Sequence, residues 1–362
     1  MKGFVRCHTR KDCTPKEGRV PASNNCAWRI GSVFVEQRSA SRGVAPDSPA
    51  RTLAVLDNAR YRGRIGFLPG NQNPEARAWP SVASPRVNEK HKIIEHYDIV
   101  SPYYSSLWGQ HIHHGYWVRG DESKETAQIQ LMDHLAELAD IKTGARILDI
   151  GCGFGGTSLY LAKKYSASTT GITISPVQVQ MAKEAAAKTN LDASFLLMDA
   201  EEMQFAQPFD VLWSVESISH YHDPRKFFGS AVKFLKPGGC FALTDWFQKE
   251  NISAADRKKF IEPIERGMMV ELRGMDDYSD FLVSSDLHIV HRQDLTLNCA
   301  KSWDIGLKII KDKKFWSLAA KLGTEFVTNL RSFHAMRAGF ASGNFVYGLL
   351  VAKMPENGSN HT

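Results

Sequence analysis

A glycine-rich segment after a run of apolar residues carries the strongest chemical signal in this sequence. The run Ile147-Leu148-Asp149-Ile150 leads into Gly151-Cys152-Gly153-Phe154-Gly155-Gly156. Glycines in such a turn let the backbone approach a ligand closely, and the N-terminus of a following helix favours negative charge. The pattern predicts a ligand site where a buried strand ends. The alternative is a tight turn without a ligand, although one turn rarely needs four glycines for its geometry.

Two kinds of cofactor compete for this segment. The spacing of Gly151, Gly153 and Gly156 also fits the dinucleotide motif G-x-G-x-x-G. A dinucleotide site needs an acid about 20 residues later, at the end of the second strand, but that strand ends in Gly171-Ile172-Thr173. Asp149 can instead meet a cationic amino group, which S-adenosyl-L-methionine has and NAD lacks. The sequence therefore favours S-adenosyl-L-methionine, bound by Asp149, Gly151, Cys152, Gly153 and Gly155.

Acidic residues after a later apolar run extend this site. Met198-Asp199-Ala200-Glu201-Glu202 follows the third predicted strand. A carboxylate there can accept a hydrogen bond from the adenine amino group, so we predict that Asp199 and Ala200 bind the cofactor. The alternative is a solvated acidic turn. The segment Leu235-Lys236-Pro237-Gly238-Gly239, which comes next in order, is mainly a helix stop.

Residues that can handle a proton follow the fourth predicted strand. Ligands bind at the mouth of open α/β sheets, where Glu216, Ser217 and His220 are placed. Methyl transfer needs a positioned acceptor and sometimes a base, and histidine has a suitable pKa. We predict His220 and Glu216 as catalytic residues, with a structural histidine or a contact to the substrate as the alternative for His220. The histidines at 111, 113 and 114 have no adjacent acid, so no metal site is predicted.

The elements around these residues alternate between strand and helix. Strands are predicted at 146–150, 169–173, 194–198, 210–215 and 241–244, and helices at 156–164, 176–189 and 226–235. Residues 289–295 and 345–351 supply two more strands. This alternation predicts an α/β fold, a Rossmann-like, doubly wound, seven-stranded sheet with helices on both faces.

These motifs, in this order, resemble those of the class I S-adenosylmethionine-dependent methyltransferases. The similarity is greatest to the tocopherol C-methyltransferases, their N-methyltransferase relatives, and the sterol and cyclopropane-fatty-acid methyltransferases. It rests on residues 108–117 (WGQHIHHGYW), 171–178 (GITISPVQ), Glu216-Ser217 with His220, and the tail 336–355. It covers roughly residues 90–355.

The resemblance implies further contacts to the cofactor. The segment Thr173–Gln178 binds the ribose through Thr173, Ser175 and Gln178, with Thr173 in place of the acid common in other class I enzymes. The aromatic segment around His113–Trp117 lies over the cofactor as a lid. Aromatic faces receive a sulfonium cation well, so Tyr97 and His113 are also predicted to bind it. Ordinary helix packing is the alternative for Tyr97, Tyr103, Trp108, Tyr116 and Trp117.

Composition divides the chain into four parts. Residues 1–88 hold 15 Lys/Arg and 6 Asp/Glu without an apolar stripe, which predicts a disordered leader or, alternatively, a mitochondrial transit peptide. A helical lid at 89–140, a methyltransferase core at 141–355 and a tail at 356–362 follow. The excess base lies in the leader, so no nucleic-acid partner is expected. Six cysteines without C-x-x-C spacing and no membrane-spanning run favour a cytoplasmic protein.

An apolar insertion at about 247–344 predicts the kind of acceptor. This helical cap insertion includes Met268-Met269-Val270, Trp303, Phe315-Trp316 and Phe326-Val327, which suits a lipophilic small molecule. We expect C-, N- or O-methylation of a ring-bearing natural product in secondary metabolism. Alternatives are a sterol or fatty-acyl C-methyltransferase, and a methyltransferase-like cyclase or binding protein that holds the cofactor without transferring methyl.

Overall fold

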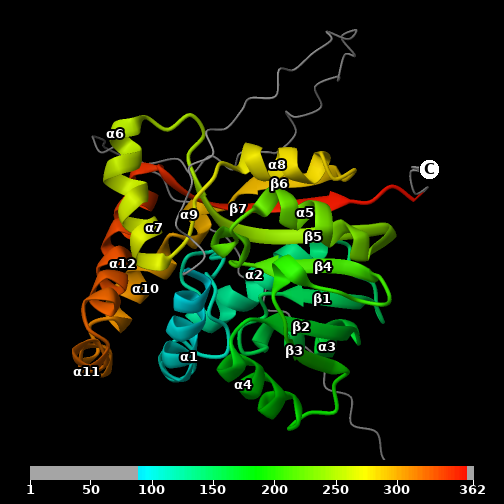
Figure 1. The fold of residues 1–362 in the computed structure, drawn as a ribbon, viewed down its shortest axis with the longest axis horizontal. Coiled ribbons are helices and arrows are strands. Elements are labelled where there is room, and N and C mark those ends of the chain that lie inside the picture. Colours follow the sequence, from blue (N-terminus) through cyan, green and yellow to red (C-terminus); the bar gives the residue numbers. More distant parts are fainter. Residues whose placement is uncertain (1–88, 357–362) are drawn as a thin grey trace, which may run out of the picture. The chain divides into compact units, whose positions relative to one another are not determined.

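The described part of the chain is built around a seven-stranded mixed sheet (Figure 1). The computed structural model describes residues 89–356, so the expected leader and all but the first residue of the expected tail lie outside the described residues. The strands run in the order β3-β2-β1-β4-β5-β7-β6, and β7 is antiparallel to both its neighbours. The predicted α/β fold class is confirmed. The strands are β1 (Arg146–Ile150), β2 (Ser168–Thr173), β3 (Ala193–Leu197), β4 (Phe209–Val215), β5 (Leu235–Gln248), β6 (His288–Asp294) and β7 (Phe345–Lys353).

Helices cover both faces of the sheet because strand residues alternate between the faces. Ile147 of β1 joins the apolar core on the face covered by α2 (Lys124–Leu138) and α3 (Gly156–Tyr165). Leu148 and Ile150 join the core on the other face, together with α5 (Pro224–Ala231) and α8 (Met275–Val283). Beside them, α4 (Pro176–Ala186) packs on β2 and β3. The sheet is thus doubly wound. Because helices cover its faces, the ends of its strands remain as the place for a binding site.

The predicted lid divides into two parts with different roles. Helix α1 (Glu89–Leu107) lies between α4 and the cap helices in Figure 1. Helix α2 instead packs on the sheet through Leu131, Met132 and Leu135, all 0% exposed. The lid expected over 89–140 is therefore limited to α1 and the segment that follows it.

The predicted cap insertion is helical only in part. Short elements η5 (Arg257–Ile261) and α6 (Ala254–Asp256) precede α7 (Glu262–Met268), and a second run holds α9 (Thr296–Cys299), α10 (Lys301–Ile309), α11 (Lys313–Leu322) and α12 (Thr324–Ser342). Between the two runs lie α8 and β6, which pack with the sheet, and β6 is the strand predicted over 289–295. Buried Trp303 and Phe340 of the cap share one core with Tyr347 of β7, so the cap packs as part of the fold.

Strand β5 is longer than the sequence pattern predicts, and the preceding helix is shorter. Helix α5 ends at Ala231, a 3-10 turn η4 (Val232–Phe234) follows, and β5 begins at Leu235 instead of residue 241. Leu235 pairs with Phe209 ahead of an irregularity in the β4–β5 ladder. Farther along, β7 pairs with β5 from Cys240 to Gln248. Pairing with β7, which local periodicity does not reveal, therefore accompanies the extension of β5 to Gln248, while its first residue pairs with β4.

Three further findings concern the described residues alone. None of their helices is long and apolar enough to cross a membrane. No group of three or more His, Cys, Asp or Glu side chains within residues 89–356 is placed to hold a metal ion. Cys152, Cys240 and Cys299 are buried free thiols, while the other three cysteines of the sequence lie outside the described residues.

Candidate functional site

A cavity that opens to solvent lies at the carboxyl ends of β1, β2 and β4. Helix α1 contributes to one wall and the cap to another. The structure brings most of the predicted site residues together here. The predicted residues that line the cavity are Tyr97, His113, Asp149, Gly151, Cys152, Gly153, Thr173, Gln178, Asp199, Ala200, Glu216 and His220.

The turn after β1 places a buried carboxylate in the cavity wall. Asp149 is 2% exposed, and its Oδ2 accepts a 2.5 Å hydrogen bond from Ser158 Oγ of α3. Burial raises the pKa of Asp149 to about 6, although the Ser158 bonds oppose the shift. The group is therefore mostly ionised at neutral pH and lacks a cationic partner among the described residues, so it is suited to receive an ammonium group.

Glycine is required at the first position of this turn. Gly151 has φ +76°, and a Cβ there would lie 2.0 Å from Oγ of Ser217, which comes from the turn after β4. The backbone of the turn after β1 therefore contacts a side chain of the turn after β4. A larger residue in place of Gly151 would push the two turns apart. The next residue, Cys152, has a thiol whose pKa burial raises well above its usual range, so this thiol stays protonated.

Two of the predicted cofactor residues do not line the cavity. Gly155 has φ +85° and precedes α3, where a Cβ would lie 2.7 Å from the ring of Phe195. Ser175 caps α4: its Oγ accepts from the backbone N–H of Gln178 at 3.1 Å and donates to Asp98 Oδ1 at 2.5 Å. Gly155 and Ser175 therefore lie outside the cavity lining and support the residues that form it.

Helix α1 is fastened to the end of β2 by side-chain hydrogen bonds. Gln178 Nε2 donates to Ser101 Oγ at 3.1 Å, and Gln178 Oε1 accepts from Thr173 Oγ1 at 2.7 Å. The Asp98–Ser175 bond adds a third link. Helix α1 therefore holds Thr173–Gln178, the segment that the resemblance assigns to the ribose. The Thr173 hydroxyl donates its hydrogen bond to Gln178.

An ion pair that the sequence did not indicate closes the adjacent side of the cavity. Lys90 Nζ of α1 lies 2.5 Å from Asp199 Oδ2 and 2.8 Å from Glu201 Oε2. Burial disfavours the Lys90 charge, but the two carboxylates outweigh it and raise its pKa. The partners are far apart in the sequence, and a lysine at the start of a helix carries no motif that would have marked this role.

His220 faces α1 and forms a pair with Tyr97. Nδ1 of His220 lies 3.2 Å from the Met269 carbonyl oxygen, and Nε2 lies 3.1 Å from the Tyr97 hydroxyl. Burial lowers the pKa of His220 to about 4 and raises that of Tyr97. At neutral pH the imidazole is therefore neutral; Nδ1–H donates to the carbonyl, and Nε2 accepts from the tyrosine O–H.

The turn that carries His220 is held by a buried aspartate. Asp245 of β5 accepts from the backbone N–H of Ser219 at 2.9 Å. Asp245 is 0% exposed, and burial raises its pKa to about 7. This bond fixes the short helix η3 (Ile218–His220) against the sheet, which gives His220 its direction.

Glu216 is the centre of a second polar group. Its Oε1 accepts from the backbone N–H of His114 at 2.6 Å, from His114 Nδ1 at 3.0 Å and from the Tyr347 hydroxyl at 2.7 Å. Burial would raise the pKa of Glu216, but the His114 ring and hydrogen bonds hold it below its usual value. Glu216 also has φ +53°, a strained backbone state that clusters at functional sites.

The predicted aromatic lid is only partly at the cavity. Trp108 and His111 to His114 line it, whereas Tyr116 and Trp117 do not. The ring of Tyr116 stacks on His134 at 4.8 Å, and Trp117 is 4% exposed with its indole N–H donating to the Glu122 carbonyl. The lid predicted over His113–Trp117 is therefore corrected: its last two aromatic residues are packing residues.

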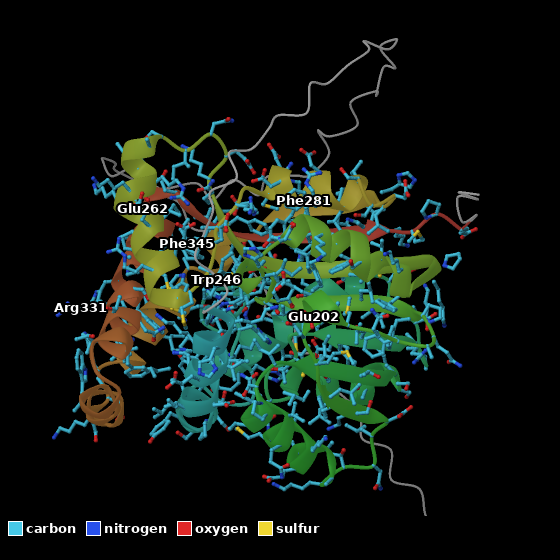
Figure 2. The ribbon with its side chains drawn as sticks, viewed as in Figure 1. Glu202, Trp246, Glu262, Phe281, Arg331 and Phe345 are labelled. Carbon is cyan, nitrogen blue, oxygen red and sulfur yellow. The ribbon has the colours of Figure 1, made fainter. Side chains whose placement is uncertain are left out.

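Aromatic residues of the cap end form the rest of the wall. Trp246 lies between the sheet and the cap helices, 5.9 Å from Phe345 between ring centroids (Figure 2). Trp303, Phe333 and Met268 line the cavity as well. The cavity therefore joins a polar end with a buried carboxylate to an apolar end with a few polar groups.

Comparison with known proteins agrees with this geometry. A sequence family described as mycolic acid cyclopropane synthetase matches residues 85–329. Tocopherol O-methyltransferase of Arabidopsis thaliana is 29% identical over 73% of this chain and 82% of its own length. The 27-O-demethylrifamycin SV methyltransferase of Amycolatopsis mediterranei is 29% identical over 72% of this chain and 96% of its own.

Solved structures share the fold. A mycolic acid cyclopropane synthase complexed with S-adenosylhomocysteine superposes with a TM-score of 0.66 at 19% identity, covering 73% of this chain and 97% of that one. The [4+2]-cyclase SpnF superposes with a TM-score of 0.65 at 24% identity, covering 73% and 95%. At these identities the likeness establishes the architecture alone.

The Lys90 ion pairs predict how firmly α1 closes the site. Replacing Lys90 by methionine removes both pairs, and because partly exposed pairs contribute only about 0.2–1 kcal/mol each, we expect α1 to open roughly twofold to thirtyfold more often. Hydrogen exchange of the α1 amides measures this. His91→Met, at an exposed neighbouring position, is the control. Equal exchange in the two variants would show that Lys90 does not hold α1.

Proposed function

The chain belongs to the mycolic acid cyclopropane synthetase family and is an S-adenosylmethionine-dependent methyltransferase, and we propose that it methylates a small, largely apolar, ring-bearing acceptor at carbon, nitrogen or oxygen. The observation that carries this proposal is the cavity, which joins the Asp149 turn to a wall of aromatic residues. The tocopherol and rifamycin methyltransferases to which the chain is similar support a ring-bearing acceptor.

The polar end of the cavity fits S-adenosylmethionine. The Asp149 carboxylate is ionised and has no cationic partner among the described residues, which suits the amino group, and the turn beside it carries the glycines at 151 and 153. Thr173 and Gln178 are the residues proposed to hold the ribose, and Asp199 is proposed to accept from the adenine amino group. When bound, the cofactor supplies an electrophilic methyl group on a sulfonium.

The Tyr97–His220 pair provides a path for the acceptor's proton. Because Nε2 of His220 already accepts from Tyr97, the histidine reaches an acceptor through the tyrosine. The Tyr97 oxygen can accept a hydrogen bond from an acceptor O–H or N–H while its own proton passes to Nε2.

The acceptor class is tested by methyl transfer from S-adenosylmethionine to three lipophilic compounds. We expect transfer to 2-methyl-6-phytyl-1,4-hydroquinone, because the cavity presents aromatic walls to a ring. A 24-methylenesterol and an unsaturated fatty acid should react at least about a hundredfold more slowly, that is, about 2.7 kcal/mol less transition-state stabilisation. Product mass and labelled methyl incorporation measure this. Preferential methylation of the fatty acid would contradict the proposal.

The role of Asp149 predicts how cofactor affinity depends on pH. With a pKa of about 6, Asp149 is ionised above that pH and protonated below it. The affinity for S-adenosylhomocysteine, whose amino group is cationic throughout, should be level above pH 7 and fall about tenfold towards pH 5. In Asp149→Asn the affinity should be low and independent of pH. Calorimetric titrations at a series of pH values measure this affinity, and Asp210→Asn, at the other end of the sheet, is the control. An affinity that does not change with pH in the wild type would contradict the role assigned to Asp149.

The proton path predicts that Tyr97 and His220 act as one unit. Tyr97→Phe and His220→Gln should each lower kcat by about 10²–10⁴-fold, and the double variant should be little slower than either, because each change breaks the same path. Cofactor affinity should stay near that of the wild type. Multiplying losses in the double variant would indicate independent roles, and full activity of His220→Gln would leave this histidine a structural residue.

A further inference from the structure

Three buried polar atoms at the apolar end of the cavity lack a hydrogen-bond partner among the described residues. They are Nε2 of His114, Nε1 of Trp246 and Nε1 of Trp303. The three residues are only 4%, 8% and 3% exposed, and all of them line the cavity. Buried polar groups in folded proteins nearly always have a partner, so three unpaired atoms in one wall indicate a place for a polar group of a ligand.

The three side chains form one cluster although they come from separate elements. His114 precedes α2, Trp246 lies on β5 and Trp303 on α10. The His114 ring is 4.7 Å from Trp303 and 6.0 Å from Trp246 between centroids, and the two tryptophans are 5.9 Å apart. In Figure 2, Trp246 lies between the sheet and the cap. The three rings that carry the unpaired atoms therefore form one cluster in the cavity wall.

Hydrogen-bond chemistry defines what this subsite can take. An indole N–H only donates, so the two tryptophans require an acceptor atom. Glu216 Oε1 lies 3.0 Å from Nδ1 of His114, and because a carboxylate only accepts, the tautomer that satisfies this bond carries its proton on Nδ1 and leaves Nε2 to accept a hydrogen bond from the ligand. A hydroxyl oxygen meets both demands, since it accepts from the indoles and donates to the imidazole. An anion is disfavoured by the nearby Glu216 carboxylate.

The surroundings of the cluster are apolar. The His114 ring stacks on Phe340 at 5.9 Å, and Trp303 meets Phe333 edge to face at 5.8 Å. A polar group isolated in such a wall orients a ligand whose remaining surface is hydrocarbon.

We propose that His114, Trp246 and Trp303 form an acceptor subsite that binds a neutral hydroxyl group carried by the acceptor's ring. The subsite deepens the proposed function and rests on it, because it presumes that the apolar end of the cavity holds the acceptor. It selects hydroxylated rings over hydrocarbons of the same shape and sets which ring position faces the methyl group.

Binding of two probes of matched shape tests this proposal. In 2-methylnaphthalene a methyl group replaces the hydroxyl of 2-naphthol. Equilibrium dialysis against the full chain, with and without S-adenosylhomocysteine, gives the affinity ratio of the two probes. In the variant Trp246→Phe/Trp303→Phe, which keeps an aromatic ring at each position and loses the N–H groups, the ratio should shift about tenfold against 2-naphthol.

A third tryptophan supplies the matched control. Trp213 of β4 also has a buried, unpaired Nε1 but does not line the cavity, so Trp213→Phe should leave the ratio unchanged. An unchanged ratio in the double variant, or no binding of either probe to the wild type, would contradict the subsite and leave a buried water as the partner of the three atoms. Failure to bind S-adenosylhomocysteine would count against the proposed function, whereas the probe ratio is measurable without it.

A measurement on the wild type avoids dependence on the variants' folding. In protein labelled with ¹⁵N-tryptophan, 2-naphthol should shift the indole N–H signals of Trp246 and Trp303 downfield, and 2-methylnaphthalene should not. The signals are assigned with the single variants Trp246→Phe and Trp303→Phe. Equal shifts with both probes would show ring contact without a hydrogen bond and would overturn the proposal.

Discussion

One carboxylate, that of Glu216, joins the three parts of the molecule that surround the cavity. Its Oε1 takes hydrogen bonds from His114, which follows the α1 lid, and from Tyr347, which lies beside the cap, while its own backbone N–H bonds to Thr244 of β5. Truncating one member of such a buried, charged group typically costs about 3–5 kcal/mol, because the others are left unpaired. The segment after α1 and the strands β5 and β7 are therefore bound to a common point beside the cap, and the positive φ of Glu216 is maintained by these bonds.

Helix α1 is held by contacts of different strength. The Lys90–Asp199 ion pair at the start of the helix is partly exposed, and pairs of this kind contribute little. Farther along, Ser101 and Ser175 form buried hydrogen bonds, and Val100 belongs to the apolar core. The first turn of α1 can therefore open while the rest of the helix stays on the fold, and local opening of this kind serves an enzyme that exchanges its cofactor at every turnover.

The features that sequence predicts well are local. The Asp149–Gly156 turn is contiguous in the chain, and its strand, glycines and helix are determined by near neighbours. Contacts between distant segments were not predictable in this way: Lys90 meets Asp199 only after α1 docks, and β5 extends to Gln248 where β7 pairs with it. Adjacent residues can also differ in role. His113 and His114 are alike in sequence, but the backbone direction turns only the His114 ring nitrogen to Glu216, and no pattern distinguishes the two.

The central claim is that one cavity under α1 holds the cofactor at its polar end and the acceptor at its aromatic end. A crystal structure of the complex with S-adenosylhomocysteine tests it most directly. The account predicts that the amino group lies within hydrogen-bond distance of Asp149, that the adenine lies beside Asp199 with α1 still closed, and that the sulfur faces the space between His220 and His114. A cofactor bound elsewhere, or bound with its sulfur turned away from these histidines, would contradict it.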